Sequence, residues 1–362
     1  MENDPARQAW TRFVNGLGAA GEIMDSNTAH LDPVERADGF RAITRITAAL
    51  LEKLEMDGLC PEVTRDNTPN HKWFMDNPDG LYWHIVVDPD QAYRIKGNLG
   101  EARYTSITAY YRGAEWYQTH ITASIADEEL RPDHEGSFEL TVSPEQPSSG
   151  IWLPLKEGTW LIWIRQFFED VRNDKPGWFV VENLKPVTAP PIIEPEVFGS
   201  NLEKLGQMIE QIVGITVGMS AMEATHTPNE VRKWEEMQGG AVFTLSDIDY
   251  MRGSWQLAPD EALVLEGRAT ACRHWNIVLY SRFLNSLEHR HRPASLTGSR
   301  VHCDPEGNYR LILAAADPGV PNWLDTEGRP FGIFAIRWLF PEEETVLPTA
   351  RVVKLDDIQS GG

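Results

Sequence analysis

The chain has 362 residues, of which 41% are hydrophobic, and it includes 13 tryptophans and 13 phenylalanines. This is enough apolar material for a large folded core, so the composition excludes global disorder. The formal net charge of −21 argues against nucleic acid as a partner and disfavours anionic membrane surfaces, because both require clustered lysine and arginine.

Residues 1–70 are predicted to form an N-terminal helical region. Asp32, Pro33 and Glu35 are typical of a helix start, because they supply a capping carboxylate, a proline in the first turn and an acid three residues on. Apolar residues then recur at helical spacing and give one packing face, made of Phe40, Ile43, Ile46, Leu50, Leu51 and Leu54.

Residues 71–190 are predicted to form a first β unit. Short segments rich in β-branched and aromatic residues, such as LYWHIVV, RYTSITAYY and TWLIWIRQFF, alternate with turn sequences such as DPD, GNLG and DHEG. This texture is typical of an antiparallel sandwich or barrel. A proline-rich stretch, KPVTAPPIIEPEVFG, follows and indicates a linker.

Residues 191–240 are predicted to hold the linker and two connector helices, and residues 241–357 a second β unit. A first connector helix follows from apolar residues at helical spacing, namely Leu202, Leu205, Ile209, Ile212 and Thr216. A second helix is expected over residues 227–237, because Thr227, Pro228 and Glu230 again resemble a helix start. The strand texture resumes after QGG and continues to the end.

The two β blocks match each other along their lengths. DQAYRIKGNLGEARYTSITAYY aligns with DEALVLEGRATACRHWNIVLYS, and the later strands align as well. By subtraction, Gly97 and Gly267 lie 170 positions apart and Arg165 and Arg337 lie 172 apart, the drift that loop insertions leave in a duplicated unit. We interpret the chain as two copies of one β unit, each preceded by helices.

Arg165 and Arg337 occupy the same place in the two copies, each in an apolar strand with alternating neighbours. An inward-facing guanidinium must have its donors satisfied, by a carboxylate or by backbone carbonyls. Because both copies carry the arginine, a structural role shared by the unit is the economical interpretation, with a tryptophan covering the guanidinium. The alternative is that Arg337 binds a carboxylate or carbonyl of a substrate.

Both blocks resemble a known family. The segments DNPDGLYWHIVVDPDQAYRIKG, DHEGSFELTVS, IWLPLKEGTWLIWIRQFF and DPGVPNWLDTEGRPFGIFAIRW are similar to the bacterial proteins catalogued as domain of unknown function 1214. The first copy has Ile151 where asparagine is usual, and the second, with Asn322 and Trp323, lacks the following proline. The resemblance implies a jelly-roll-like sandwich and no particular activity. The predicted fold is therefore mainly β with helical additions: two duplicated jelly-roll-like antiparallel β-sandwich units, N-terminal helices and a helical connector.

Several polar and aromatic residues are candidates for chemistry. Tyr82 and His84 would share one strand face, which suits a general acid/base pair, although the loop before them is also ordinary turn geometry. His289 and His291 have a spacing seen in metal sites, but no third ligand stands at a convincing position, so a basic loop is favoured and no metal is predicted. Trp116 is a candidate for stacking on flat ligands or sugars, as is Trp255.

Motifs for other functions are absent from the sequence. It contains no GxGxxG after a strand, no phosphate-binding GxxxxGK[ST] and no GxSxG, so no nucleotide cofactor is expected. Three widely spaced cysteines without a CxxC pair predict neither a disulfide framework nor a zinc finger. The N-terminus lacks a signal-peptide pattern, and no stretch reaches the ~18 consecutive apolar residues of a membrane helix, so a cytoplasmic protein is expected.

We therefore expect a cofactor-independent enzyme that acts on a small, partly apolar organic molecule bearing a carboxylate or carbonyl, by lyase, isomerase or hydrolase chemistry. The residues expected to move protons are His84, Tyr82, His289 and His291. Those expected to bind the substrate are Arg337, Asn322, Trp323, Asp317 and Trp116. The alternative is a non-catalytic β-sandwich protein that binds a small molecule or carbohydrate, and a homo-oligomer is possible in either case.

Overall fold

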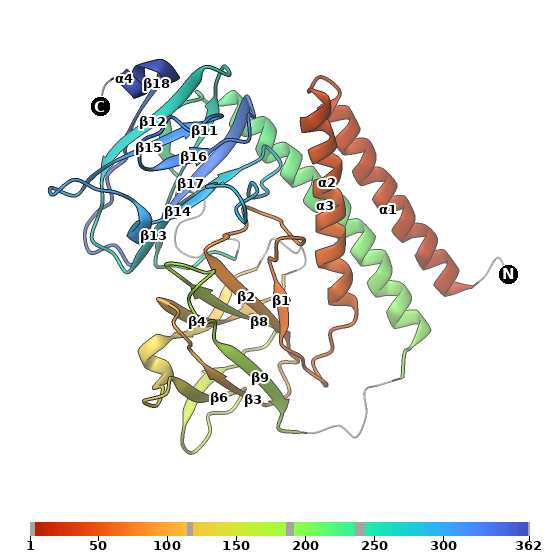
Figure 1. The fold of residues 1–362 in the computed structure, drawn as a ribbon. Helices are drawn as coiled ribbons and strands as arrows, with labels where there is room; N and C mark the ends of the chain where they lie inside the picture. Colours follow the sequence, from red (N-terminus) through yellow and green to blue (C-terminus); the bar gives the residue numbers. More distant parts are fainter. Residues whose placement is uncertain (1–3, 114–118, 186–191, 236–242, 361–362) are drawn as a thin grey trace.

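The computed structural model describes residues 4–113, 119–185, 192–235 and 243–360. These residues are mainly β, with four sheets in two similar halves, two N-terminal helices and one long central helix (Figure 1). The predicted fold class is therefore confirmed. Among the described residues, no helix is both long enough and apolar enough to cross a membrane.

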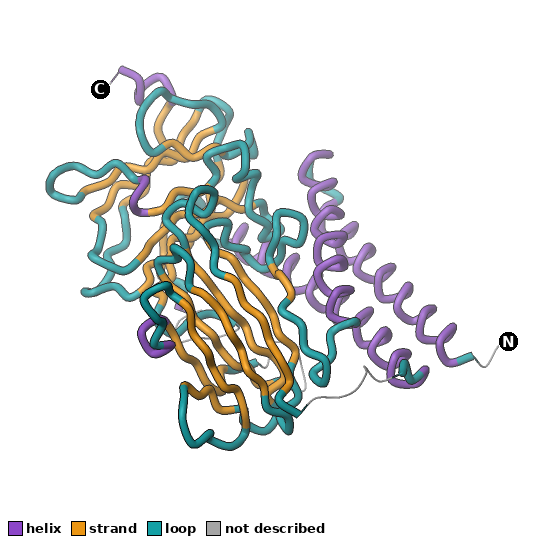
Figure 2. Tube along the Cα trace, turned by 60° about the horizontal axis from the view of Figure 1, so that its bottom comes forward, coloured by secondary structure: helices purple, strands orange, loops and turns teal. Residues whose placement is uncertain are grey.

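Three helices pack together along one side of the strands (Figure 2). Helices α1 (Pro5–Thr28) and α2 (Pro33–Leu51) begin at a proline, and the carboxylates of Asp4 and Asp32 accept hydrogen bonds from their first amides. Helix α3 (Pro195–Thr225) lies so close to α1 that a Cβ on Gly16 would stand 2.6 Å from the carbonyl oxygen of Gly206. A short α4 (Leu355–Ser360) ends the described chain.

The first β unit is a sandwich of two sheets. Its five-stranded sheet has the order β1-β2-β8-β4-β5 and its four-stranded sheet the order β7-β6-β3-β9. Side chains from both sheets fill one core between them, as expected for alternating strands packed face to face. The strands are β1 (Thr64–Asp66), β2 (Gly80–Val86), β3 (Tyr93–Asn98), β4 (Tyr104–Tyr111), β5 (Ile121–Ala126), β6 (Ser137–Ser143), β7 (Ile151–Pro154), β8 (Thr159–Phe167) and β9 (Trp178–Asn183).

The second β unit repeats this arrangement strand for strand. Its sheets have the orders β10-β11-β17-β13-β14 and β16-β15-β12-β18, and the short parallel pair β6–β7 recurs as β15–β16. Gly136 and Gly307, which the repeat aligns, both have a φ of 85° in equivalent turns. The strands are β10 (Val231–Lys233), β11 (Ile248–Gln256), β12 (Glu261–Arg268), β13 (His274–Tyr280), β14 (Ser295–Thr297), β15 (Asn308–Ala314), β16 (Trp323–Asp325), β17 (Phe331–Leu339) and β18 (Thr349–Lys354).

The two units pack against each other through their five-stranded sheets. One buried cluster contains Tyr110 and Leu161 of the first unit together with Val278 and Ile333 of the second. Each five-stranded sheet is therefore covered on both faces, by its own four-stranded sheet on one side and by the other unit on the other. The duplicated units form one body, and the boundary between them is apolar.

The prediction of a second connector helix over residues 227–237 is wrong for the part of this range that the structure describes. Helix α3 ends at Thr225, and Val231–Lys233 form β10 instead, which pairs antiparallel with β11 at the edge of the second unit. Pairing with that sheet edge satisfies the backbone groups of this segment, and it overrides the local signal for a helix start.

Candidate functional site

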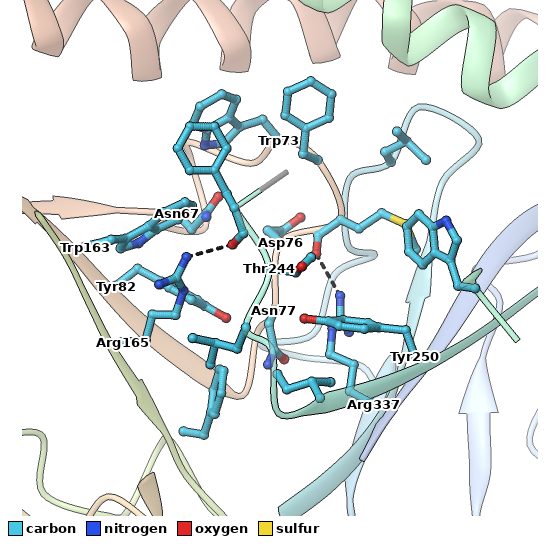
Figure 3. Close-up of a pocket in the computed structure, with 18 of the residues that line it drawn as sticks. Asn67, Trp73, Asp76, Asn77, Tyr82, Trp163, Arg165, Thr244, Tyr250 and Arg337 are labelled. Carbon is cyan, nitrogen blue, oxygen red and sulfur yellow. Dashed lines mark hydrogen bonds between the residues drawn. The ribbon is translucent and has the colours of Figure 1, made fainter. Parts of the chain in front are cut away.

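A cavity of about 300 Å³ lies where the two five-stranded sheets meet beside helix α3 (Figure 3). Strands β2, β8, β11 and β17 supply one side of it, and Ile215 and Met219 of α3 supply another. A concave, mainly apolar space with a few polar groups is typical of small-molecule sites. The walls are largely aromatic and include Trp73, Phe74, Trp163, Phe167, Trp234 and Phe243.

Two buried arginines point into this cavity, one from each β unit (Figure 3). Arg165 on β8 is 3% exposed and Arg337 on β17 is 9% exposed. Nη2 of Arg165 donates to the hydroxyl of Tyr110 at 2.8 Å and to the Phe243 carbonyl at 2.7 Å, and Nη2 of Arg337 donates to the Met75 carbonyl at 2.9 Å. Within the described residues, Nη1 of each arginine is buried without a hydrogen-bond partner. Each guanidinium therefore retains a donor for a ligand.

Tyrosines accompany both arginines in the same arrangement. Tyr82 on β2 lies directly opposite the first arginine in the strand register, and Tyr250 on β11 lies directly opposite the second. On the neighbouring strands, the ring centroid of Tyr110 lies 5.4 Å from the first guanidinium carbon and that of Tyr280 lies 5.7 Å from the second. The duplication has therefore placed two copies of one arginine–tyrosine group on the same cavity.

The backbone carbonyls that hold the arginines come from the opposite unit in each case. Met75 lies in the segment that leads into β2, and Phe243 lies at the equivalent place before β11. Both adopt left-handed backbone angles, with φ of 59° and 63°, and so do Asn67, Phe74 and Leu284, which also line the cavity. Bulky residues rarely adopt this conformation, and such strained positions cluster at binding sites.

Neither guanidinium group in the cavity is paired with a carboxylate. Neither Arg165 nor Arg337 has a carboxylate within 4.0 Å among the described residues. Burial raises the pKa of Tyr82 and raises that of Tyr250 to about 12, although both arginines oppose the rise, so the two phenols stay protonated at neutral pH. The site therefore offers two cations and two hydroxyl donors, which together suit an anionic or carbonyl oxygen.

Of the residues predicted for the site, the structure brings Tyr82 and Arg337 together at this cavity. Sequence reasoning missed Tyr250, although the repeat could have identified it, because Tyr250 lies 168 residues after Tyr82 at the equivalent position. It also interpreted Arg165 chiefly as a structural residue. Nothing in the sequence marks the lead-in residue Met75, because a left-handed methionine has no compositional signature.

His84 lies outside the cavity lining, on the strand that carries Tyr82. Its ring packs edge-on against Trp163, with centroids 4.6 Å apart. Lys53 Nζ donates to its Nδ1 at 2.7 Å, so the ring proton resides on Nε2, 3.5 Å from Asp66 Oδ2. Burial lowers the pKa of His84 to about 3, with Lys53 contributing and Asp66 opposing. His84 is therefore neutral at physiological pH and separated from the cavity by an indole ring.

His289 and His291 lie in the loop before β14, away from the cavity lining. His289 is half-buried and its backbone carbonyl accepts a hydrogen bond from Arg172, whereas His291 is exposed. Burial lowers the pKa of His289 to about 4. Across the described residues, no group of three or more histidine, cysteine, aspartate or glutamate side chains is arranged to hold a metal ion.

The remaining predicted binding residues lie near the β15–β16 connection on the outer sheet. Asp317 is exposed and caps its own turn. Asn322 exchanges two hydrogen bonds of 2.8 Å with the backbone of His302. The indole of Trp323 donates to a backbone carbonyl at 3.1 Å, as that of Trp152 does in the first unit at 3.0 Å. The contacts of Trp323 are thus common to both copies.

The two tryptophans considered for ligand stacking give different outcomes. Trp116 lies outside the described residues. The prediction of an exposed Trp255 is wrong, because this residue is 0% exposed and its indole donates to the Arg329 carbonyl at 3.0 Å. A Cβ on Gly332, its partner on β17, would stand only 2.0 Å from the ring, so the absence of a side chain there makes the room for burial.

Comparisons with known proteins bear on the family and the fold. Residues 84–168, which lie within the first β unit, match the model of a family described as protein of unknown function (DUF1214), so the predicted resemblance is confirmed over these residues. No curated protein matches the chain.

Two solved structures share its architecture. An uncharacterised protein from Burkholderia cenocepacia is 29% identical, with a TM-score of 0.90 over 97% of this chain and 98% of that one. A protein from Vibrio parahaemolyticus is 12% identical, with a TM-score of 0.50 over 88% of this chain and 98% of that one, a likeness of fold alone. The pair of β units with attached helices is therefore a recurring arrangement.

Proposed function

We propose that the chain binds a small, partly apolar organic molecule through its carboxylate or carbonyl in the cavity between the two β units. The observation that carries this proposal is the pair of buried guanidinium groups, Arg165 and Arg337, each with an unpaired donor in an aromatic cavity. Burying a cation without a counter-charge is costly, and a bound anion would offset that cost. The largely apolar walls favour an organic acid over a carbohydrate, which needs many polar partners.

Catalysis at the same cavity is the second candidate, and the two tyrosines favour it. Figure 3 shows the hydroxyls of Tyr82 and Tyr250 pointing toward one another between the two arginines. Protonated phenols aimed at a substrate oxygen would stabilise negative charge that develops there in a lyase, isomerase or hydrolase reaction. Asp76 is a carboxylate in the described lining, and both its oxygens accept hydrogen bonds from Ser286, at 2.8 and 2.6 Å. It would be the candidate base.

A thermal-shift measurement on the full chain tests binding directly. Benzoate, cyclohexanecarboxylate and octanoate are compared with their neutral amides, because a ligand that binds only the folded state raises the melting temperature. We expect the acids to raise it more than the amides, and Arg337→Met to reduce the effect. Arg351→Met is the matched control, since Arg351 is exposed on the edge strand β18. If no acid and no amide changed the melting temperature, the proposal would be contradicted. NMR of an acid that binds would then show whether the protein converts it, which distinguishes an enzyme from a non-catalytic binding protein.

A further inference from the structure

The cavity presents its polar groups as two equivalent sets. The first set is Arg165 with Tyr82, neighbours in the β2–β8 pairing, and the second is Arg337 with Tyr250, neighbours in the β11–β17 pairing. Figure 3 shows the two guanidinium groups entering from opposite sides, with both hydroxyls between them. Each guanidinium has one unpaired nitrogen, Nη1, so two carboxylate groups would allow each set to bind one of them.

The charge of the site leads to the same conclusion. Both arginines are buried, and no described carboxylate lies within salt-bridge distance of either guanidinium group. Asp76 also lines the cavity, but both its oxygens are held by Ser286 and it pairs with neither arginine, so a dianion would give each guanidinium its own counter-charge. Burial keeps both phenols protonated, so each can donate a hydrogen bond to a carboxylate.

Both sets are oriented by the protein before any ligand arrives. Each guanidinium is fixed by a carbonyl of the opposite unit, from Phe243 at 2.7 Å and from Met75 at 2.9 Å. Each also lies against a buried tyrosine ring on the neighbouring strand. Donors that are already oriented lose little conformational freedom on binding, so both sets are prepared to contribute affinity.

We propose that the ligand is a dicarboxylate with an apolar body, in which each carboxylate is bound by one arginine–tyrosine set and the body lies against the aromatic walls. This inference rests on the proposed function and deepens it by naming the class of ligand. The apolar lining distinguishes the ligand from small, fully polar diacids, because it offers contact area to a hydrocarbon or aromatic body.

Isothermal titration of the full chain with three matched series of acids tests the proposal. The first series contains straight-chain α,ω-dicarboxylates from six to ten carbons. The second contains their alkylmalonate isomers, which carry the same two charges close together, and the third contains monocarboxylates of equal carbon number. We expect at least one dicarboxylate, of either series, to bind about tenfold or more tightly than the matching monocarboxylate, because a second charge-assisted contact forms. Whether this dicarboxylate belongs to the straight-chain or to the alkylmalonate series shows how far apart the two carboxylates lie when bound.

Titrations of variants in the two arginine–tyrosine sets provide a second test of the proposal. In Arg165→Met and in Arg337→Met, the dicarboxylate is expected to bind no more tightly than the monocarboxylate, while each variant still binds the monocarboxylate through its remaining arginine. If one variant lost all binding while the other bound as well as the unmodified protein, the proposal would be overturned, because only one arginine would then bind the ligand. If either variant fails to fold, Tyr82→Phe and Tyr250→Phe replace them, and each is expected to reduce the advantage of the dicarboxylate.

The outcomes separate this inference from the function on which it rests. Equal affinity for dicarboxylates and monocarboxylates in the unmodified protein would overturn the dicarboxylate proposal and leave binding of organic acids intact. Failure of every acid to bind would overturn both. A preference for dicarboxylates that persists in Arg165→Met and Arg337→Met would also overturn the inference, because it would arise outside the two sets.

Discussion

Arg165 and Arg337 exchange backbone partners between the two β units: each donates to a carbonyl in the segment that leads into the other unit. Arg165 binds the carbonyl of Phe243 at 2.7 Å and Arg337 binds that of Met75 at 2.9 Å. One nitrogen of each guanidinium therefore fastens the units together, while another stays unpaired at the cavity. The structural and the ligand-binding interpretations of Arg337 are thus compatible, because different nitrogens of the same group serve them.

The two arginines differ in how much structure depends on them, and this predicts unequal costs of removal. Arg165 makes two hydrogen bonds and lies 4.1 Å from the ring centroid of Trp163, whereas Arg337 makes one hydrogen bond. We expect Arg165→Met to lower the free energy of unfolding by about 1–2 kcal/mol more than Arg337→Met. Urea unfolding without ligand measures the free energy of unfolding of both variants. A larger loss for Arg337→Met than for Arg165→Met would contradict this prediction.

Local patterns predicted the two units well, because strand alternation and turn residues are properties of neighbouring residues. The alignment of Gly136 with Gly307 is confirmed by their equal φ angles, and that of Arg165 with Arg337 by their equivalent strands. The segment at Val231–Lys233 was mistaken for a helix, because its pairing with β11 depends on residues far along the chain.

The cavity itself could not be predicted, because it arises only where two sheets and a helix meet. Tyr82 and Arg337 are 255 positions apart by subtraction, and no local pattern brings them together. His289, Asn322 and Asp317 were chosen for their chemical type, yet such residues also serve loops and turns, where the structure places them. For Arg337 the repeat supplied information beyond chemical type, and the structure places this residue at the cavity.

The contact between helices α1 and α3 depends on one glycine more than on its neighbour in sequence. A Cβ on Gly16 would stand 2.6 Å from the carbonyl oxygen of Gly206, and backbone cannot yield without separating the helices, whereas a Cβ on Gly18 meets nothing within 4 Å. We expect Gly16→Ala to destabilise the protein by about 2 kcal/mol and Gly18→Ala to stabilise it by about 0.5–1 kcal/mol. If both substitutions shifted the melting temperature in the same direction, the close contact between α1 and α3 at Gly16 would be contradicted.

Stability should fall as pH is lowered below 7, in part through His84. Its pKa is lowered from 6.5 to about 3, chiefly by burial, so between these values the unfolded chain binds a proton that the folded chain excludes. The free energy of unfolding therefore rises with pH in this window, and His84 alone accounts for about 2 kcal/mol between pH 5 and 7.

Urea unfolding of the unmodified protein and of His84→Gln, at pH 5, 6 and 7, measures this contribution. The variant should show a flatter dependence of stability on pH, and the same slope in both would refute the assignment. Some dependence should remain in the variant, because burial also lowers the pKa of His289, to about 4.

Glu223 ties helix α3 to the second β unit through a buried ion pair. Its Oε1 accepts from Arg252 Nη2 at 2.8 Å and from Arg232, and Glu223 and Arg252 are 1% and 2% exposed. Glu223→Gln leaves buried guanidinium charge facing a neutral amide, so we expect a loss of about 3 kcal/mol in the free energy of unfolding. Glu203→Gln on the same helix is the control: its pair with Arg12 is partly exposed to solvent, and a loss below about 1 kcal/mol is expected. Similar losses in both would contradict the buried pair's importance.

The hydroxyls of Tyr82 and Tyr250 are expected to strengthen binding of a carboxylate by donating hydrogen bonds to it. Tyr82→Phe and Tyr250→Phe should each weaken binding about fivefold, the effect of one lost hydrogen bond of about 1 kcal/mol. Tyr309→Phe is the matched control, because the Tyr309 hydroxyl is buried in the core of the second unit, away from the cavity, and has no partner among the described residues.

The pH dependence of binding distinguishes this role from simple packing. Because burial raises the pKa of Tyr250 to about 12, its hydroxyl stays protonated and binding should persist unchanged from pH 7 to pH 10. Deprotonation of either phenol would place a negative charge beside the ligand carboxylate, so affinity would fall with rising pH if the tyrosines titrated normally. Titration calorimetry across this range measures it, and a decline before pH 10 in the unmodified protein but not in Tyr250→Phe would show that the phenol is ionised instead of donating.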